Sequence, residues 1–171
     1  MNKYKVELKR VKFFEPMSEE TNAFVADLYI NGKKVGYVKN DGQGGPNDYH
    51  GNTKEDNQLI AEVEAYCKTL PKVKPDGYNF VYQPSLETMI DDQFELWLKN
   101  REEKKMQKLM EKAIVIGKPN GNSYSYVKNK SKLSEIPTNV LQSQVDRIKA
   151  KYCTDGVVIL NTNLSKLGIV I

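Results

Sequence analysis

The residues best suited to bind another molecule lie in the second half of the chain. Tyr124 and Tyr126 lie in a predicted hairpin, and three lysines follow at alternate positions. Tyrosine rings stack on nucleic-acid bases, and lysines neutralise phosphates. The candidate residues for binding nucleic acid or another partner are Tyr124, Tyr126, Lys128, Lys130, Lys132, Arg101 and Lys105. The alternative is an ordinary surface, because half-exposed strands favour tyrosine and lysine is a general solubilising residue.

Charge is distributed unevenly along the chain. Residues 99–132 contain ten Lys or Arg and three Glu, a balance of +7. Residues 1–98 carry −4, and residues 133–171 carry +1. Only one of the ten basic residues is arginine, which argues against bidentate recognition of base edges. The pattern therefore favours contact with phosphates over direct recognition of bases.

A glycine-rich loop within residues 41–52 offers a second kind of chemistry. Successive backbone amides can converge on an anion, so Gly42, Gly44 and Gly45 are the candidate residues of a phosphate loop. In the P-loop and the dinucleotide fingerprint a helix begins directly after the glycines, whereas here Pro46 and further loop residues intervene. Two alternatives remain. The segment is either an ordinary surface loop or a functional site, which would bind a nucleotide or small ligand or perform catalysis.

Signals for metal binding and catalysis are weak. Glu87, Asp91 and Glu95 share one helical stripe and offer the oxygen ligands that divalent cations prefer, but the wet face of an amphipathic helix has the same pattern. His50 is the only histidine and has no recognisable partner in the sequence. The motifs of α/β-hydrolases and zinc proteases are absent. We expect no metal, no cofactor and no catalytic residues, and the sequence favours a binding protein over an enzyme.

Composition places the chain among ordinary globular proteins. It has 171 residues, of which 39% are hydrophobic and 28% are charged, enough to build a core without disulfides. No apolar run approaches the roughly 18 residues of a membrane span, and the first residues lack the apolar core of a secretory signal. These features predict a cytoplasmic protein without membrane contact.

Hydrophobic patterning predicts the elements of the first half. We expect a strand with a bulge at 4–14, a hairpin at 23–39, a loop at 40–52, a helix at about 53–69, and a connection at 71–84 with a short strand at 78–82. Asn-Gly at positions 31–32 is the signature of a type I′ turn. This turn predicts that Leu28 pairs with Val35. It also predicts that Ala26 pairs with Tyr37, which places Tyr37 on the apolar face.

A long helix is predicted at about 86–113, with Ser85 as its N-cap. Its first half has a clear apolar stripe in which we expect Trp97 to be largely buried. Residues 99–105 contain no apolar side chain and no helix breaker, so we expect the helix to continue and to join two halves of the protein. The second half then shows a hairpin around 118–122, a helix at about 138–152 and a buried strand at 157–160.

This order of elements predicts an α+β fold, with antiparallel hairpins packed on helices and one long central helix. We expect an N-terminal part of strand, hairpin and helices at residues 1–98. The second part, residues 99–171, contains the basic helix, the second hairpin, a helix and a strand. One continuous domain is the alternative to this division.

Residues 17–42 resemble a segment of uncharacterised hypothetical proteins from bacteria and their phages, in which a strand, an Asn-Gly turn and a glycine-rich loop occur together. The resemblance covers about a quarter of the chain and implies no activity. With the charge pattern and the ten tyrosines, it leads us to expect a non-enzymatic binding protein. The expected role is that of a phage or mobile-element accessory factor acting on a host protein or nucleic acid.

Overall fold

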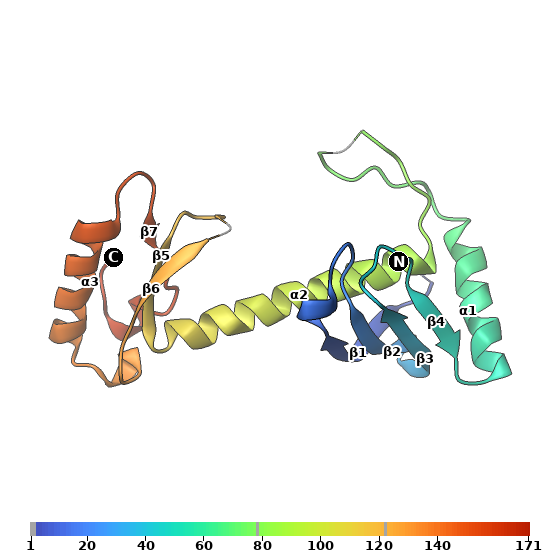
Figure 1. Ribbon diagram of the computed structural model, residues 1–171, viewed down its shortest axis with the longest axis horizontal. Coiled ribbons are helices and arrows are strands. Elements are labelled where there is room, and N and C mark those ends of the chain that lie inside the picture. The colour runs from blue at the N-terminus through green and yellow to red at the C-terminus, as the bar shows by residue number, and fades with distance from the viewer. Residues whose placement is uncertain (1–2, 78, 122) are drawn as a thin grey trace. The chain divides into compact units, whose positions relative to one another are not determined.

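The computed structural model describes residues 3–77, 79–121 and 123–171 (Figure 1). It contains a four-stranded and a three-stranded antiparallel sheet, together with three α-helices. The α+β fold predicted from the sequence is confirmed. The chain forms two compact units, residues 1–98 (unit 1) and residues 99–171 (unit 2).

Unit 1 is built on the sheet β1-β2-β3-β4, in that order. Its strands are β1 (Val6–Phe13), β2 (Phe24–Ile30), β3 (Lys33–Asn40) and β4 (Asp48–Gly51), and a short 3-10 helix, η1 (Glu15–Met17), follows β1. The predicted bulge in β1 is present, because its pairing with β2 shifts between Lys9 and Lys12. Arg10 lies in this bulge with a positive φ of 52°.

The tight turn between β2 and β3 is the predicted one. Asn31 and Gly32 both have positive φ, 51° and 80°, as a type I′ turn requires. The register beyond the turn differs from the prediction, because the ladder shifts by one residue at Val35 and Leu28 pairs with Gly36. Tyr37 therefore faces Asp27 and is exposed, so its predicted place on the apolar face was wrong.

Strand β4 lies within the segment that the sequence predicted to be a loop. Tyr37, Val38 and Lys39 of β3 pair with residues 48–50 of β4. Close approach of the two strands depends on Gly36, since a Cβ at this position would lie 1.9 Å from the His50 carbonyl oxygen. The loop is thus shorter than predicted. Residues 48–51 form a strand because they pair with β3, although their local sequence does not favour one.

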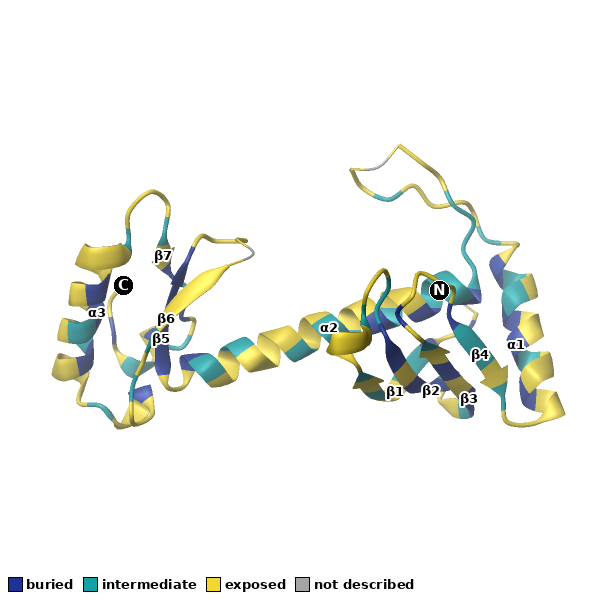
Figure 2. Ribbon diagram, viewed as in Figure 1, coloured by how far each residue is buried: buried dark blue, intermediate teal, exposed yellow. Residues whose placement is uncertain are grey.

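Helix α1 (Lys54–Cys67) covers the sheet of unit 1 with one apolar face (Figure 2). The Thr53 hydroxyl caps it by accepting the Asp56 amide at 3.1 Å. The first part of α2 (Leu86–Met110) adds an aromatic cluster in which Phe94 stacks on Phe24 with ring centroids 4.0 Å apart. Trp97 packs beside Phe94 but is only partly buried, less than predicted.

The connection between α1 and α2 contains no strand in its described residues. Val73 and Tyr82 form an isolated bridge through two backbone hydrogen bonds. The strand predicted at 78–82 is therefore reduced to this single pair at Tyr82, and Tyr78 lies outside the described residues. Gln83 holds the connection to the end of α1, because its amide donates to the carbonyls of Cys67 and Leu70.

Helix α2 begins at the predicted cap, where Ser85 Oγ accepts the Thr88 amide at 3.1 Å. It is unbroken through residues 99–105, as the absence of helix breakers predicted. It supplies residues 86–98 to unit 1 and residues 99–110 to unit 2.

Unit 2 contains a sheet in the order β6-β5-β7. Its elements are β5 (Ala113–Gly117), β6 (Tyr124–Lys128), η2 (Leu133–Glu135), α3 (Thr138–Tyr152), β7 (Val158–Ile159) and η3 (Ser165–Leu167). The second hairpin and the third helix were both predicted, but β7 is shorter than the expected strand and Val158 is exposed. Helix α3 buries Leu141, Val145 and Ile148 in the core (Figure 2).

A buried asparagine holds the C-terminal part of unit 2 to β5. Asn161 Oδ1 accepts the Val115 amide at 2.7 Å, and Asn161 Nδ2 donates to the Ala113 carbonyl at 2.9 Å. Its amide thus continues the ladder beyond β7 and satisfies two buried backbone groups.

Among the described residues, no helix combines the length and the apolarity of a membrane span.

Candidate nucleic-acid interface

Strand β6 forms an edge of the unit 2 sheet, with β5 on one side and no strand on the other in the described residues. The Asn129 amide donates to the Lys112 carbonyl at 2.7 Å, which fixes the phase of the ladder. Because ladder hydrogen bonds alternate along an antiparallel strand, Tyr124, Tyr126 and Lys128 turn their backbone N–H and C=O groups outward. The free edge therefore offers backbone donors and acceptors.

The side chains of these same residues share one face of β6, since they alternate along the strand. Tyr124 and Tyr126 are 49% and 53% exposed, and Lys128 is also exposed. The intervening Val127 packs against the core of unit 2, which explains why the tyrosines face outward. Two aromatic rings with accessible π-faces thus lie two residues apart on one strand.

Two more exposed lysines, Lys130 and Lys132, follow β6. We call the set Tyr124, Tyr126, Lys128, Lys130 and Lys132 the Tyr–Lys surface. Within the described part of the chain, no ion pair engages Lys128 or Lys130, and Lys132 lies 3.7 Å from Glu111. This distance and the exposure of both partners make the pair weak, so the surface keeps most of its positive charge.

The other two candidate residues lie on α2 and are paired with a carboxylate. Lys105 lies 2.8 Å from Glu102 Oε1, and Arg101 lies 3.5 Å from the same oxygen. Their charge is therefore partly balanced locally, unlike that of Lys128 and Lys130.

The two units differ in overall charge. Unit 2 contains fourteen Lys or Arg and six Asp or Glu, a net charge of +8, whereas unit 1 has a net charge of −4. A concentration of positive charge attracts polyanions and increases their rate of association.

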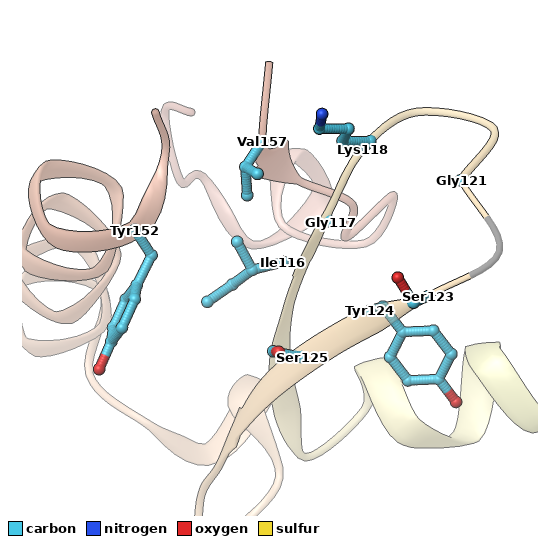
Figure 3. Close-up of a pocket in the computed structure, with 9 residues that line it drawn as sticks. All are labelled: Ile116, Gly117, Lys118, Gly121, Ser123, Tyr124, Ser125, Tyr152 and Val157. Carbon is cyan, nitrogen blue, oxygen red and sulfur yellow. The ribbon is translucent and has the colours of Figure 1, made fainter. Parts of the chain in front are cut away.

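A pocket of about 540 Å³ lies between the end of α3 and the β5–β6 hairpin (Figure 3). We call it the hairpin pocket, and its lining residues are Ile116, Gly117, Lys118, Gly121, Ser123, Tyr124, Ser125, Tyr152 and Val157. Figure 3 shows Tyr152 on the α3 side, facing Ile116 and Ser125 on the sheet. The Tyr124 ring lies on the other side of β6 from Ser125, so Tyr124 connects the pocket to the Tyr–Lys surface.

Most lining residues of the hairpin pocket were not found from the sequence. Tyr152 follows Leu141, Val145 and Ile148 at helical spacing, which is typical of a packed side chain, whereas it is 44% exposed. The signal available from the sequence was its place at the last residue of the helix. No local sequence pattern marks Lys118 or Ser125 as binding residues. The folded hairpin brings them together.

A second pocket of about 520 Å³ lies where Asn129, after β6, meets the first half of α3. Gln144 donates to Asn129 Oδ1 at 3.1 Å, while the buried Asn129 Nδ2 has no acceptor among the described residues. Arg147 lines this pocket and is exposed, and no ion pair engages it in the residues that the structure describes. One further cationic group, Arg147, thus lies beside the segment that follows β6.

The glycine-rich loop of unit 1 uses its amides internally. Gly42 and Gly44 have positive φ, 87° and 83°. The Gly42 amide donates to Asn40 Oδ1 at 2.9 Å, and the Gly44 amide donates to Thr21 Oγ1 at 3.2 Å. The Gly45 carbonyl accepts Asn40 Nδ2 at 3.1 Å. In this arrangement the amides of Gly42 and Gly44 are directed at side chains of the protein itself.

Carboxylates surround the cavity beside this loop. Buried Asn47 donates its amide to Glu87 Oε1 and its side chain to Asp91 Oδ1, both at 2.7 Å. Burial raises the pKa of Glu87 above its ordinary value. Glu20 and Glu95 complete an acidic rim around a cavity of about 350 Å³. The stripe on α2 therefore anchors the loop, a role that the sequence did not reveal.

No metal centre is found in residues 3–77, 79–121 and 123–171. These residues contain no group of three or more His, Cys, Asp or Glu able to hold a metal ion. His50 lies on β4 with Nε2 2.7 Å from Asp48 Oδ1, and both side chains are exposed.

Comparisons with protein-family models, curated proteins and solved structures found no match. Function is therefore inferred from the geometry and charge of the residues themselves.

Proposed function

We propose that this protein is a non-enzymatic binding protein whose unit 2 binds single-stranded nucleic acid through the Tyr–Lys surface. The observation that supports this proposal is the pair of exposed tyrosines on one face of edge strand β6, together with three exposed lysines of which only Lys132 has an ion-pair partner, a weak one. Rings provide stacking platforms for bases, and lysines neutralise the phosphates between them.

Single strands fit this surface better than duplexes. Stacking on Tyr124 and Tyr126 requires bases whose faces are accessible, and bases inside a duplex are already stacked on one another. The outward N–H and C=O groups of β6 add donors and acceptors for sugars, phosphates or base edges. Because arginine is scarce near β6, we expect weak preference for base sequence.

The glycine-rich loop is the less favourable site for a phosphate. Its neighbours Glu20, Glu87, Asp91 and Glu95 repel anions, and unit 1 carries net negative charge. A role as an accessory factor of a phage or mobile element remains part of our proposal. It is supported only by the resemblance of residues 17–42 to hypothetical proteins of such elements.

The salt dependence of binding tests the proposal. Fluorescently labelled single-stranded DNA and RNA are titrated with the protein by anisotropy at several salt concentrations. The affinity should fall steeply with salt, because each neutralised phosphate contributes about −0.7 to the logarithmic slope. Replacing Lys128, Lys130 and Lys132 with Gln should reduce that slope by about two, if each contacts one phosphate.

The matched control carries the same charge change on unit 1. Lys68, Lys72 and Lys74 are exposed, and no ion pair engages them among the residues described. Their replacement with Gln should leave the salt slope unchanged. Absence of binding to both DNA and RNA at low salt would overturn the proposal and leave a host protein as the expected partner.

A further inference from the structure

The hairpin pocket has the walls that a flat aromatic ring requires. The Tyr152 ring bounds it on the α3 side, and Ile116 and Val157 provide aliphatic surface opposite (Figure 3). A planar heterocycle between an aromatic and an aliphatic wall gains stacking and loses water from both faces. The volume of about 540 Å³ lies within the usual range of small-molecule sites.

Polar groups at the rim match the edges of such a ring. Ser123 and Ser125 are exposed and bring hydroxyls, which both donate and accept hydrogen bonds. Lys118 supplies a positive charge, and no carboxylate lines the pocket among its described residues. A ligand with a hydrogen-bonding ring and a phosphate satisfies all of these features.

We propose that the hairpin pocket binds one nucleotide, with its base beside Tyr152 and its phosphate toward Lys118. This inference rests on the proposed function, because it adds a second base site to the strand bound on the Tyr–Lys surface. Tyr124 belongs to both sites, so a strand stacked on Tyr124 passes directly to the pocket around β6. One base thus enters a defined pocket while its neighbours stack on an open surface.

Titration of the full chain with mononucleotides tests the pocket directly. The probes are AMP, CMP, GMP and UMP, with ribose 5-phosphate and inorganic phosphate as controls for the phosphate alone. In an NMR titration, the amides of Gly117, Ser125 and Tyr152 should shift and saturate with at least one nucleotide. Ribose 5-phosphate should bind at least about tenfold more weakly, because base stacking is absent. Equal affinity for ribose 5-phosphate would overturn the base pocket and leave an anion site.

Two kinds of variant test the contribution of the Tyr152 ring and the contribution of the cavity separately. Tyr152→Leu removes the ring and should weaken nucleotide binding about tenfold, whereas Tyr152→Phe should retain it. Ser125→Leu fills the pocket and should abolish binding. Unchanged amide shifts in the core of unit 2 confirm that each variant is folded. Unchanged nucleotide affinity in folded Tyr152→Leu and Ser125→Leu variants would overturn the inference.

The same variants distinguish failure of the pocket from failure of the proposed function. If oligonucleotides bind and depend on Tyr124 and Tyr126 but not on Tyr152, the pocket is excluded and the proposed function stands. If no oligonucleotide binds at low salt while mononucleotides bind at Tyr152, the proposed function fails and the pocket is a site for free nucleotides.

Discussion

Units 1 and 2 use their polar side chains in opposite ways. In unit 1 several charged groups on the sheet and on α1 are engaged with one another: Asp27 pairs with both Arg10 and Lys34, and Asp56 pairs with Lys33. In unit 2 the lysines after β6 remain largely unpaired, and the tyrosines of that strand face solvent. A group that already has a partner contributes to stability, whereas an exposed, unpaired group is available to a ligand.

The cores show a parallel difference. Unit 1 is held by a cluster of aromatic rings around Phe94, while unit 2 has an aliphatic core and a buried amide, Asn161. The stability of unit 1 should therefore be most sensitive to loss of ring volume, and the stability of unit 2 to loss of one hydrogen-bonding side chain.

The largest expected effect comes from the aromatic cluster. Phe94→Ala should lower the free energy of unfolding of unit 1 by about 3–5 kcal/mol, because it removes a buried ring that contacts Phe24, Phe13 and Trp97. Denaturant unfolding followed by Trp97 fluorescence measures it. Leu96→Ala on the exposed side of the same helix should change stability by less than about 0.5 kcal/mol. Similar losses in both variants would contradict the assigned core face.

In unit 2 the buried amide should matter nearly as much. Asn161→Leu keeps similar volume but leaves the Val115 N–H and the Ala113 C=O without partners, which should cost about 2–4 kcal/mol. Hydrogen exchange of the Val115 amide should become correspondingly faster. Asn139→Leu makes the same chemical change on the exposed surface of α3 and should leave that exchange rate unaltered.

Binding should depend on the tyrosines of unit 2 and not on those of unit 1. Tyr124→Ala and Tyr126→Ala should each weaken affinity for single-stranded nucleic acid by about 1–3 kcal/mol, the usual contribution of one stacked base. Tyr37→Ala removes an equally exposed strand tyrosine from unit 1 and should have no effect on anisotropy titrations. An equal loss in all three variants would show that no specific stacking occurs on β6.

The smallest effect is a pH dependence in unit 1. Desolvation alone would raise the pKa of Asp27, but its bonds with Lys34 and Arg10 outweigh it and lower the pKa below its ordinary value. A lowered native pKa means that this stabilisation is present at neutral pH and is lost as the pH falls through that value.

Melting temperatures across acidic pH test this assignment. Asp27→Asn should melt below the native protein at neutral pH, and the difference should shrink as the pH falls below about 4. Asp76→Asn, at an exposed position, should melt like the native protein at every pH. A constant difference for Asp27→Asn would contradict the ion-pair assignment.

Local sequence signals predicted much of the fold. Asn31-Gly32 specified its turn because few other residue pairs adopt two successive positive φ angles, and α3 begins and ends where its apolar spacing does. The bulge at Val35 and strand β4 could not be predicted in this way. Both depend on pairing between strands, and two of the four residues of β4, Asp48 and Gly51, favour turns.

The candidate site could likewise be predicted only where its residues are adjacent in the sequence. Tyr124, Tyr126 and the following lysines were identified because they are adjacent in sequence. The hairpin pocket joins Lys118, Ser125 and Tyr152, which only the folded chain brings together. The anchoring of Asn47 by Glu87 and Asp91 is equally non-local and was missed for the same reason.

The hydrogen bonds of Asn161 also have a consequence for the order in which the protein forms during synthesis. All residues of unit 1 are available once residue 98 has left the ribosome, so this unit can fold while translation continues. Strand β5 must wait for Asn161, and the core around it also requires Ile169. The nascent chain therefore carries a folded acidic unit ahead of an unfinished basic one, and the Tyr–Lys surface forms last.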